Sequence, residues 1–176
     1  LGKIGTEYQN TRHNIGFDIV DQLGKILKGT FNSAKYGDIL KSKYAGKQII
    51  LLKPNTFMNL SGKAVLYWLK KEKIHTNNLI VIVDDLNINF GVSRLKPSGS
   101  DGGHNGLKDI TNSLNTSSFT RLRFGIGNNF KKKDQVDFVL SKWNNEEAIN
   151  LEKLINKNVE IIFSSIKQGL DFTMNK

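Results

Sequence analysis

Apolar residues recur every three or four positions in four parts of the chain. In the first of these parts, Ile19, Leu23 and Ile26 fall on one face of a helix, and charged residues occupy the opposite face. This spacing is typical of an amphipathic helix packed against a core. The same pattern recurs later in the chain, so we expect helices over residues 13–28, 60–73, 105–114 and 145–168.

Strand patterns alternate with these helices. The run Leu79–Val83 consists only of Leu, Ile and Val, which is typical of a short strand covered on both faces. Further strands are expected over residues 36–44, 48–53, 92–96 and 121–127. No internal repeat or linker interrupts the alternation, so we expect one layered α/β domain over residues 1–176.

The first residues are unusual for such a domain. Leu1-Gly2 resembles the end of a strand whose beginning is absent, and the chain carries no initiator Met. We therefore expect the first strand to be truncated, either by a shortened reading frame or by trimming of the chain.

Composition narrows the possible chemistry. The 176 residues include no Cys, which excludes disulfides, thiolate metal sites and cysteine nucleophiles. No apolar run approaches the ~20 residues that span a bilayer, and the start does not resemble a signal peptide, so we expect a cytoplasmic protein. Lys and Arg number 26 against 16 Asp and Glu, a net charge of +10. Such an excess attracts polyanions, although AT-rich genomes also enrich Lys, Asn and Ile.

Three histidines are the candidates for acid–base chemistry, because their ordinary pKa lies near working pH. They are His13, His75 and His104, and their spacing disfavours a zinc site. His13 stands where a loop enters the first helix, and there it is either a base or a capping or surface residue. His75 lies in a polar connector and should be solvated.

Other polar residues stand at strand and helix ends. Asp84 closes the buried strand, where it can hold a histidine, or Asp84-Asp85 can simply cap a turn. His104 belongs to a Gly-rich turn whose N–H groups suit phosphate or carbonyl oxygens, unless the segment only turns. Asn59 is by default the N-cap of the following helix, and its neighbours Phe57 and Met58 are by default core residues.

Five separated motifs together resemble bacterial peptidyl-tRNA hydrolases. They are Leu1–Gly5 with Glu7-Tyr8 and Thr11-Arg12-His13-Asn14, then Lys53-Pro54-x-Thr56-Phe57-Met58-Asn59-Leu60-Ser61-Gly62, Asp84-Asp85-Leu86, Gly102-Gly103-His104-Asn105-Gly106-Leu107 and Arg121-Leu122-Arg123-x-Gly125-Ile126-Gly127. Their order and spacing fit the family from Leu1 to about Leu140. A string such as Thr-Phe-Met-Asn-Leu-Ser-Gly is very rare by chance, so the resemblance is specific.

The resemblance implies a fold and an activity. The fold is a single domain of three layers, with a twisted mixed β-sheet flanked by helices. The activity is hydrolysis of the ester between a peptide and the 3′ ribose of tRNA, which returns free tRNA to translation. The resemblance further implies a monomer that needs no metal and no cofactor and does not bind a membrane.

The resemblance also assigns roles residue by residue. His13 matches the catalytic histidine, Asp84 the acid that orients it, and Asn59 and Asn105 the amides that line the site. Other matched positions surround the peptide and the tRNA 3′ end, and a basic flank would hold the acceptor stem. The first group comprises Tyr8, Asn14, Phe57, Met58, His104 and Asn105, and the flank comprises Lys96, Arg121 and Arg123.

One segment departs from the family pattern. Relatives normally read Leu-Gly-Asn-Pro-Gly where this chain has Leu1–Gly5 with Lys3 and Ile4 inside it. A lysine there can lower the pKa of His13 or compete for Asp84 by forming a salt bridge. Three hypotheses therefore stand: an active hydrolase, an RNA-binding relative without catalysis, and an inactive truncated product. Retention of His13, Asp84, Asn59 and Asn105 favours the enzyme.

Overall fold

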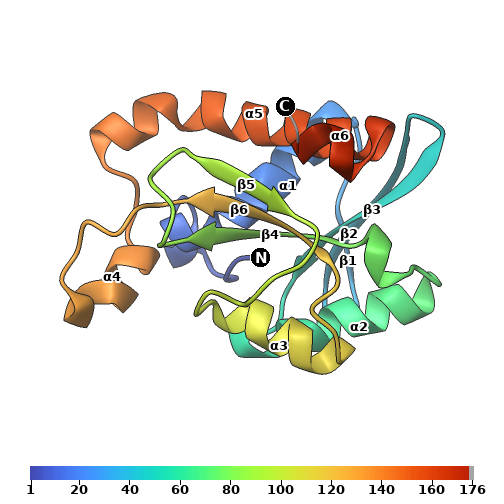
Figure 1. The fold of residues 1–176 in the computed structure, drawn as a ribbon, viewed down its shortest axis with the longest axis horizontal. Helices are drawn as coiled ribbons and strands as arrows, with labels where there is room; N and C mark the ends of the chain where they lie inside the picture. The colour runs from blue at the N-terminus through green and yellow to red at the C-terminus, as the bar shows by residue number, and fades with distance from the viewer. Residues whose placement is uncertain (175–176) are drawn as a thin grey trace.

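The computed structural model of the chain describes residues 1–174, with the backbone alone described at residue 132 (Figure 1). The α-helices are α1 (Ile15–Ile26), α2 (Ser61–Lys71), α3 (Asn105–Leu114), α4 (Gln135–Leu140), α5 (Asn145–Gln168) and α6 (Leu170–Met174). The strands are β1 (Asn32–Ala34), β2 (Gly37–Tyr44), β3 (Lys47–Pro54), β4 (Ile80–Asp85), β5 (Ser93–Lys96) and β6 (Thr120–Gly125). Short 3-10 turns are η1 (Thr6–Tyr8), η2 (Arg12–Asn14), η3 (Met58–Leu60), η4 (Thr76–Asn78) and η5 (Lys132–Asp134). Residues 175 and 176, the end of the expected domain, lie outside the described residues.

The six strands form two separate three-stranded sheets. One sheet has the order β1-β2-β3 and is antiparallel throughout. The other has the order β4-β6-β5, with β4 parallel and β5 antiparallel to β6. The α/β class and the mixed pairing are confirmed. The one continuous sheet that we expected is instead divided, because β3 and β4 face each other without hydrogen bonding.

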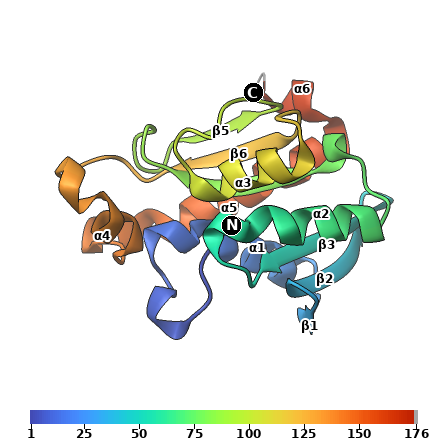
Figure 2. The same ribbon diagram turned by 90° about the horizontal axis from the view of Figure 1, so that it is seen from below.

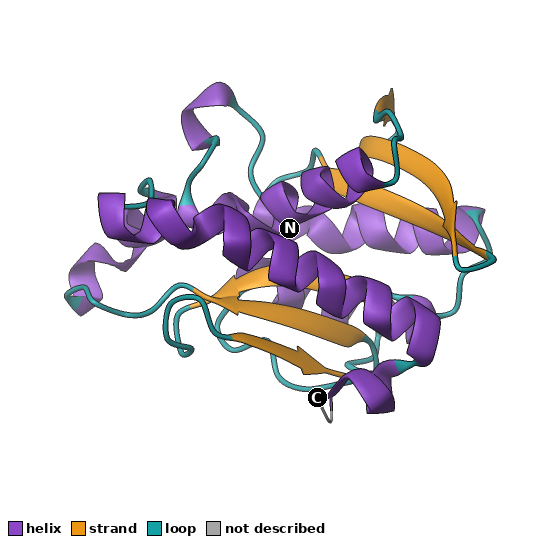
Figure 3. Ribbon diagram, turned by 90° about the horizontal axis from the view of Figure 1, so that it is seen from above, coloured by secondary structure: helices purple, strands orange, loops and turns teal. Residues whose placement is uncertain are grey.

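Helices cover both faces of the mixed sheet. Strand β4 alternates its side chains between two cores, with Ile82 packed among residues of α1 and α5, and Val81 and Val83 among residues of α2 and α3. Figure 1 shows α5 on one side of the sheet and α3 on the other, and Figure 2 shows α2 and α3 together on that second side. Figure 3 shows the long helix α5 crossing the opposite side. These are the three layers that the resemblance implied.

A groove of about 720 Å³ separates the two sheets. Its walls are the facing edges of β3 and β4, and apolar side chains of α1, α2 and α5 complete its lining. Leu1 also lines the groove, and its terminal nitrogen donates a hydrogen bond of 2.5 Å to the carbonyl oxygen of Ile82. A Cβ at Gly16 would collide with Leu1 and Ile82 backbone atoms. A glycine is therefore required where α1 passes under the first residue.

The four periodic segments are confirmed as helices. The bounds expected for residues 105–114 and 145–168 agree with α3 and α5, whereas α1 begins two residues later than expected, after the turn η2. The short helices α4 and α6 were not expected. No helix within residues 1–174 combines the length and the apolar composition that crossing a membrane requires.

Candidate active site

The side chains of His13 and Asp84 meet where α1 begins and β4 ends. His13 lies in η2, the turn that leads into α1, and Asp84 is the fifth residue of β4. Nδ1 of His13 is 2.9 Å from Oδ1 of Asp84. The carboxylate is only 5% exposed, whereas the His13 side chain is 14% exposed. A buried acid thus holds one ring nitrogen, and the other has no partner among the residues that the structure describes.

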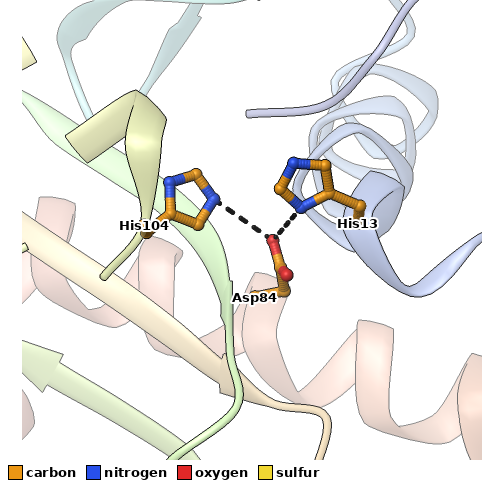
Figure 4. A group of neighbouring side chains, drawn as sticks. All are labelled: His13, Asp84 and His104. Atoms are coloured by element: carbon orange, nitrogen blue, oxygen red, sulfur yellow. Dashed lines mark hydrogen bonds and ion pairs between the residues drawn. The ribbon is translucent and has the colours of Figure 1, made fainter. Parts of the chain in front are cut away.

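His104 contacts the same oxygen of Asp84 from the opposite side (Figure 4). Its Nε2 lies 3.3 Å from Asp84 Oδ1. Its Nδ1 accepts the backbone N–H groups of Gly106 and Leu107 and so caps the N-terminus of α3. Because Nδ1 accepts two N–H donors, the His104 proton resides on Nε2 and is donated to Asp84.

This arrangement changes two expectations for the Gly-rich turn. The N–H groups of Gly106 and Leu107 bond to His104, and that of Gly103 bonds to Asp101 Oδ1 at 2.8 Å. These three groups are therefore not free for a phosphate or a carbonyl oxygen. His104 itself, which we expected beside the substrate, contacts Asp84.

The two histidine donors keep Asp84 ionised. Burial by itself would raise the pKa of this carboxyl group, but the hydrogen bonds from His104 and His13 outweigh burial and hold the pKa well below its usual range. A charged Asp84 requires a proton on Nδ1 of His13. The lone pair on Nε2 of His13 is then free to accept a proton.

Asp85, the next residue, has a different environment. Its Oδ1 accepts the backbone N–H of Asn87 at 2.8 Å, and its Oδ2 pairs with Arg123 at 2.8 Å. The turn-capping role that we held open for the Asp84-Asp85 pair thus belongs to Asp85 alone.

Among the described residues, one cluster has ligand atoms close enough together to hold a metal ion. The ligand atoms of His13, Asp84 and His104 lie within 4.8 Å of one another. Metal binding through Nε2 of His104 would move the ring proton to Nδ1, where it would face the N–H groups that this nitrogen now accepts. The hydrogen-bond pattern therefore fits proton transfer better than metal coordination.

The two amide side chains that the resemblance assigned to the site are both exposed. Asn59 lies in η3 and is exposed, and α2 begins at Ser61 without a side-chain cap. The default role of Asn59 as an N-cap is therefore wrong. Asn105 is the first residue of α3 and is also exposed. Neither amide has a hydrogen-bond partner within the part of the chain that is described, so both can bind a substrate.

Phe57 and Met58, which precede Asn59 in the chain, have different environments. A Cβ placed on Gly106 would lie 2.7 Å from Met58 Sδ and 3.1 Å from His104 Cε1, so η3 and the start of α3 lie side by side. Phe57 is 78% exposed, which contradicts its default assignment to the core. Met58, in contrast, packs partly against the core beside α2 and α3.

The buried side chain of Asn14 supports the first loop. It is buried, its Oδ1 accepts the Lys3 N–H at 2.6 Å, and its Nδ2 donates to the Lys3 carbonyl at 2.9 Å. The Lys3 ammonium lies 3.9 Å from the centroid of the Tyr8 ring. Asp84 accepts hydrogen bonds from the two histidines, and the ion pairs among the described residues do not join it to Lys3.

The basic residues of the expected tRNA-binding flank have unequal exposure. Lys96 is exposed at the end of β5. Arg121 is fully buried and donates to the carbonyl oxygens of Ser117 and Phe119. Direct contact of Arg121 with tRNA is therefore contradicted, because its guanidinium group lies inside the protein.

Arg123, the third residue of the expected flank, is also largely buried. The Arg123 side chain is 13% exposed, pairs with Asp85 and also donates to the Ser100 carbonyl oxygen. It therefore holds the loop before α3 more than it faces solvent. Arg94, which we did not predict, is exposed two residues before Lys96 on the same face of β5. The alternation of exposed cations along this strand was the signal that could have revealed it.

Comparison with known proteins decides the ancestry. The family model described as Peptidyl-tRNA hydrolase matches residues 1–176. The chain belongs to the peptidyl-tRNA hydrolase family. The peptidyl-tRNA hydrolase of Parabacteroides distasonis is 50% identical over 176 residues, which are 100% of this chain and 94% of that protein. That of Clostridium botulinum is 41% identical over 177 residues, covering 100% of this chain and 93% of that protein.

Solved structures agree with this assignment. A crystal structure of peptidyl-tRNA hydrolase from Acinetobacter baumannii superposes with a TM-score of 0.92 at 34% identity, covering 99% of this chain and 89% of that one. A peptidyl-tRNA hydrolase in complex with N-propanol superposes with a TM-score of 0.93 at 35% identity, covering 99% and 90%. The resemblance to peptidyl-tRNA hydrolases that the sequence motifs indicated is confirmed.

Proposed function

We propose that this chain hydrolyses the ester that joins a peptide to the 3′ ribose of tRNA. Family membership over residues 1–176 supports the activity and the substrate class. The observation that carries the mechanism is the 2.9 Å contact between His13 Nδ1 and Asp84 Oδ1. This contact sets the tautomer in which the free Nε2 of His13 can act as a base.

The reaction begins with a water molecule beside His13. Nε2 takes a proton from this water as its oxygen attacks the ester carbonyl carbon, and Asp84 stabilises the resulting imidazolium. The tetrahedral intermediate then expels the ribose 3′ oxygen, which receives the proton from His13. One water molecule is consumed, and the products are the carboxylic acid of the peptide and the 3′ hydroxyl of the ribose. No covalent enzyme intermediate forms. No step requires a metal ion or a cofactor.

The free amides complete the proposed site. Asn59 holds the attacking water or donates to the developing oxyanion, an effect of up to ~3–4 kcal/mol in other hydrolases. Asn105 binds the main chain of the peptide, which lets the enzyme accept any side chain. Phe57, Met58 and Tyr8 surround the peptide and the 3′ end. Asn14 and His104 act indirectly, through the first loop and through Asp84.

The tRNA itself is held through its phosphates. Lys96 is retained for this role because it is exposed, and Arg94 joins it on the same face of β5. Arg123 orients the adjacent loop, and Arg121 contributes to the fold beneath it. Phosphate contacts carry no base sequence, so an enzyme of this kind accepts many tRNAs. We further propose that it works as a monomer in the cytoplasm, where translation supplies its substrate.

Release of the N-acetyl amino acid from an N-acetyl-aminoacyl-tRNA tests the proposal. We expect the wild type to cleave this ester and His13→Ala to lower kcat by ~10²–10⁴-fold, since a positioned base contributes about that much. His75→Ala is the matched control, because His75 is exposed in a connector. A wild type that binds tRNA without cleaving it would make this chain an RNA-binding relative. A wild type that does neither would make it an inactive product.

A further inference from the structure

Lys3 stands next to the catalytic turn, and its position is fixed. Its backbone N–H and carbonyl group both bond to the buried amide of Asn14, the residue that follows His13. The preceding residue, Gly2, allows this close approach, because a Cβ there would lie 2.7 Å from the Phe17 ring and 2.9 Å from Asn14 Oδ1. The base of the Lys3 side chain is therefore tied to the element that carries the catalytic histidine.

The ammonium group of Lys3 is held without an acid. Nζ lies 3.9 Å from the Tyr8 ring centroid, and this contact is a cation–π interaction. The ion pairs found in residues 1–174 do not include Lys3. Because a π face neutralises no charge and leaves N–H donors open, this ammonium group can bind an anion.

The proposed substrate brings one anion close to the ester. The ribose that carries the peptide also carries, at its 5′ carbon, the last phosphate of the tRNA. When the ester carbonyl lies beside His13, this phosphate is one ribose away, which is within reach of a lysine attached to the same turn. Asp84 cannot compete with the phosphate, because its carboxylate is buried and already receives two histidine donors.

We infer that Lys3 binds the phosphate of the 3′-terminal nucleotide and thereby positions the ester beside His13. This inference rests on the proposed function and names a contact within the same site. Tyr8 then holds the ammonium group in place before the substrate arrives. Lys3 precedes the turn η1, whereas Arg94 and Lys96 belong to β5, and we expect the two basic regions to bind different parts of the tRNA.

Two small esters isolate this contact. One is an N-acetyl-aminoacyl ester of adenosine, which has no phosphate, and the other is the same ester of adenosine 5′-monophosphate. We expect Lys3→Gln to raise KM for the monophosphate ester by roughly 3- to 10-fold at low salt, as a partly exposed ion pair would. KM for the adenosine ester and kcat for both esters should stay near the wild-type values. Lys3→Arg should restore the wild-type KM.

Lys43→Gln is the matched control, since it removes the same charge from an exposed position on the β2–β3 hairpin. An equal effect of Lys3→Gln on both esters, or an effect on kcat alone, would refute a phosphate contact. No effect on either ester would refute it as well.

Direct binding of adenosine and its 5′-monophosphate, followed by NMR shifts, separates this inference from the proposed function. If the wild type cleaves no ester but binds the monophosphate better than adenosine in a Lys3-dependent way, the phosphate site stands and the hydrolase proposal fails. If the monophosphate has no Lys3-dependent advantage, the phosphate site fails, whatever the hydrolysis assay gives.

Discussion

Two histidines share one carboxylate oxygen, and the backbone decides how they differ. His104 accepts two N–H groups at Nδ1, so its proton must face Asp84. His13 also donates to Asp84, but its second nitrogen has no protein partner among the described residues. The same acid therefore fixes both rings, and of the two only His13 keeps a ring lone pair without a partner among the described residues.

His104 offers a pair of substitutions that separates its two contacts. Asparagine places an oxygen near the position of Nδ1 and preserves the helix cap, whereas glutamine reaches Asp84 with an N–H and removes the cap. We expect His104→Asn to lower kcat by roughly 10-fold, because it removes a hydrogen bond to a charged group. His104→Gln should retain more activity but lower the unfolding free energy by about 1 kcal/mol. Steady-state kinetics and thermal unfolding measure the two effects.

The reverse ranking would contradict this assignment. If His104→Gln were less active than His104→Asn, the cap of α3 would matter more than the contact with Asp84. His75→Asn controls for the removal of an imidazole at an exposed position.

Asp18 in α1 makes stability depend on pH. Burial is the main cause that raises its pKa to about 6, and the nearby Asp21 adds to it, while Lys53 and Lys25 oppose it. The folded-state pKa thus lies above the ordinary value of 3.8. Ionised Asp18 therefore destabilises the fold, fully above pH 6 and not at all below the unfolded pKa. We expect Asp18→Asn to raise the unfolding free energy by roughly 1–3 kcal/mol at pH 7.

This gain should shrink as the pH falls from 6 towards 4, because the wild type then becomes protonated on folding. Urea unfolding of both proteins at several pH values gives the comparison. A gain that is the same at pH 4 and pH 7 would show that the amide acts through packing or hydrogen bonding and not through the charge.

At the scale of elements, the turn η2, which carries His13, is anchored to the C-terminal half of the chain. Arg12 precedes His13 in η2 and pairs with Glu147 at 2.5 Å, and its guanidinium group lies 4.4 Å from the Phe138 ring centroid. Glu147 also forms a capping box with Asn144 at the start of α5. Turn η2 therefore cannot move without disturbing α4 and the first turn of α5.

Periodic elements could be predicted from the sequence, and short ones could not. Helices α3 and α5 carry enough apolar repeats to define their ends, and Asn144 with Glu147 gives α5 a start signal. Helix α4 has only six residues, too few for a clear period, and it is held by contacts such as that of Phe138 with Arg12. The division into two sheets also escaped prediction, because local patterns do not show which strand edges pair.

The sequence motifs identified the candidate site residues, but they did not show all the contacts that those residues make with one another. The resemblance brought His13 and Asp84 together, although 71 positions separate them. No sequence pattern indicated that His104 donates to the same oxygen. The prediction put Arg121 on the tRNA-binding surface, because a basic residue in a strand is normally exposed. In the structure, backbone carbonyls and the Phe119 ring hold its guanidinium group inside the protein.

At the scale of the whole molecule, the position of the positive charges says more about a polyanionic partner than the net charge of +10 does. The register pairs Arg94 with Arg123 and Lys96 with Arg121, so all four cations lie on one face of the mixed sheet. The inner pair holds the loop and the strand in place, and the outer pair, Arg94 and Lys96, is exposed. The edge strand β5 therefore presents two exposed cations side by side.

Removing the outer pair should weaken tRNA binding in a salt-dependent way. Eliminating one cation that binds a phosphate should reduce the slope of log K against log salt by a little under one unit, because fewer counterions are released. We therefore expect Arg94→Ala with Lys96→Ala to reduce the slope by about one to two units in filter binding of tRNA. Lys43→Ala combined with Lys28→Ala is a control of equal charge change. An unchanged slope in the β5 variant, or an equal change in the control, would mean that tRNA responds to net charge and not to this face.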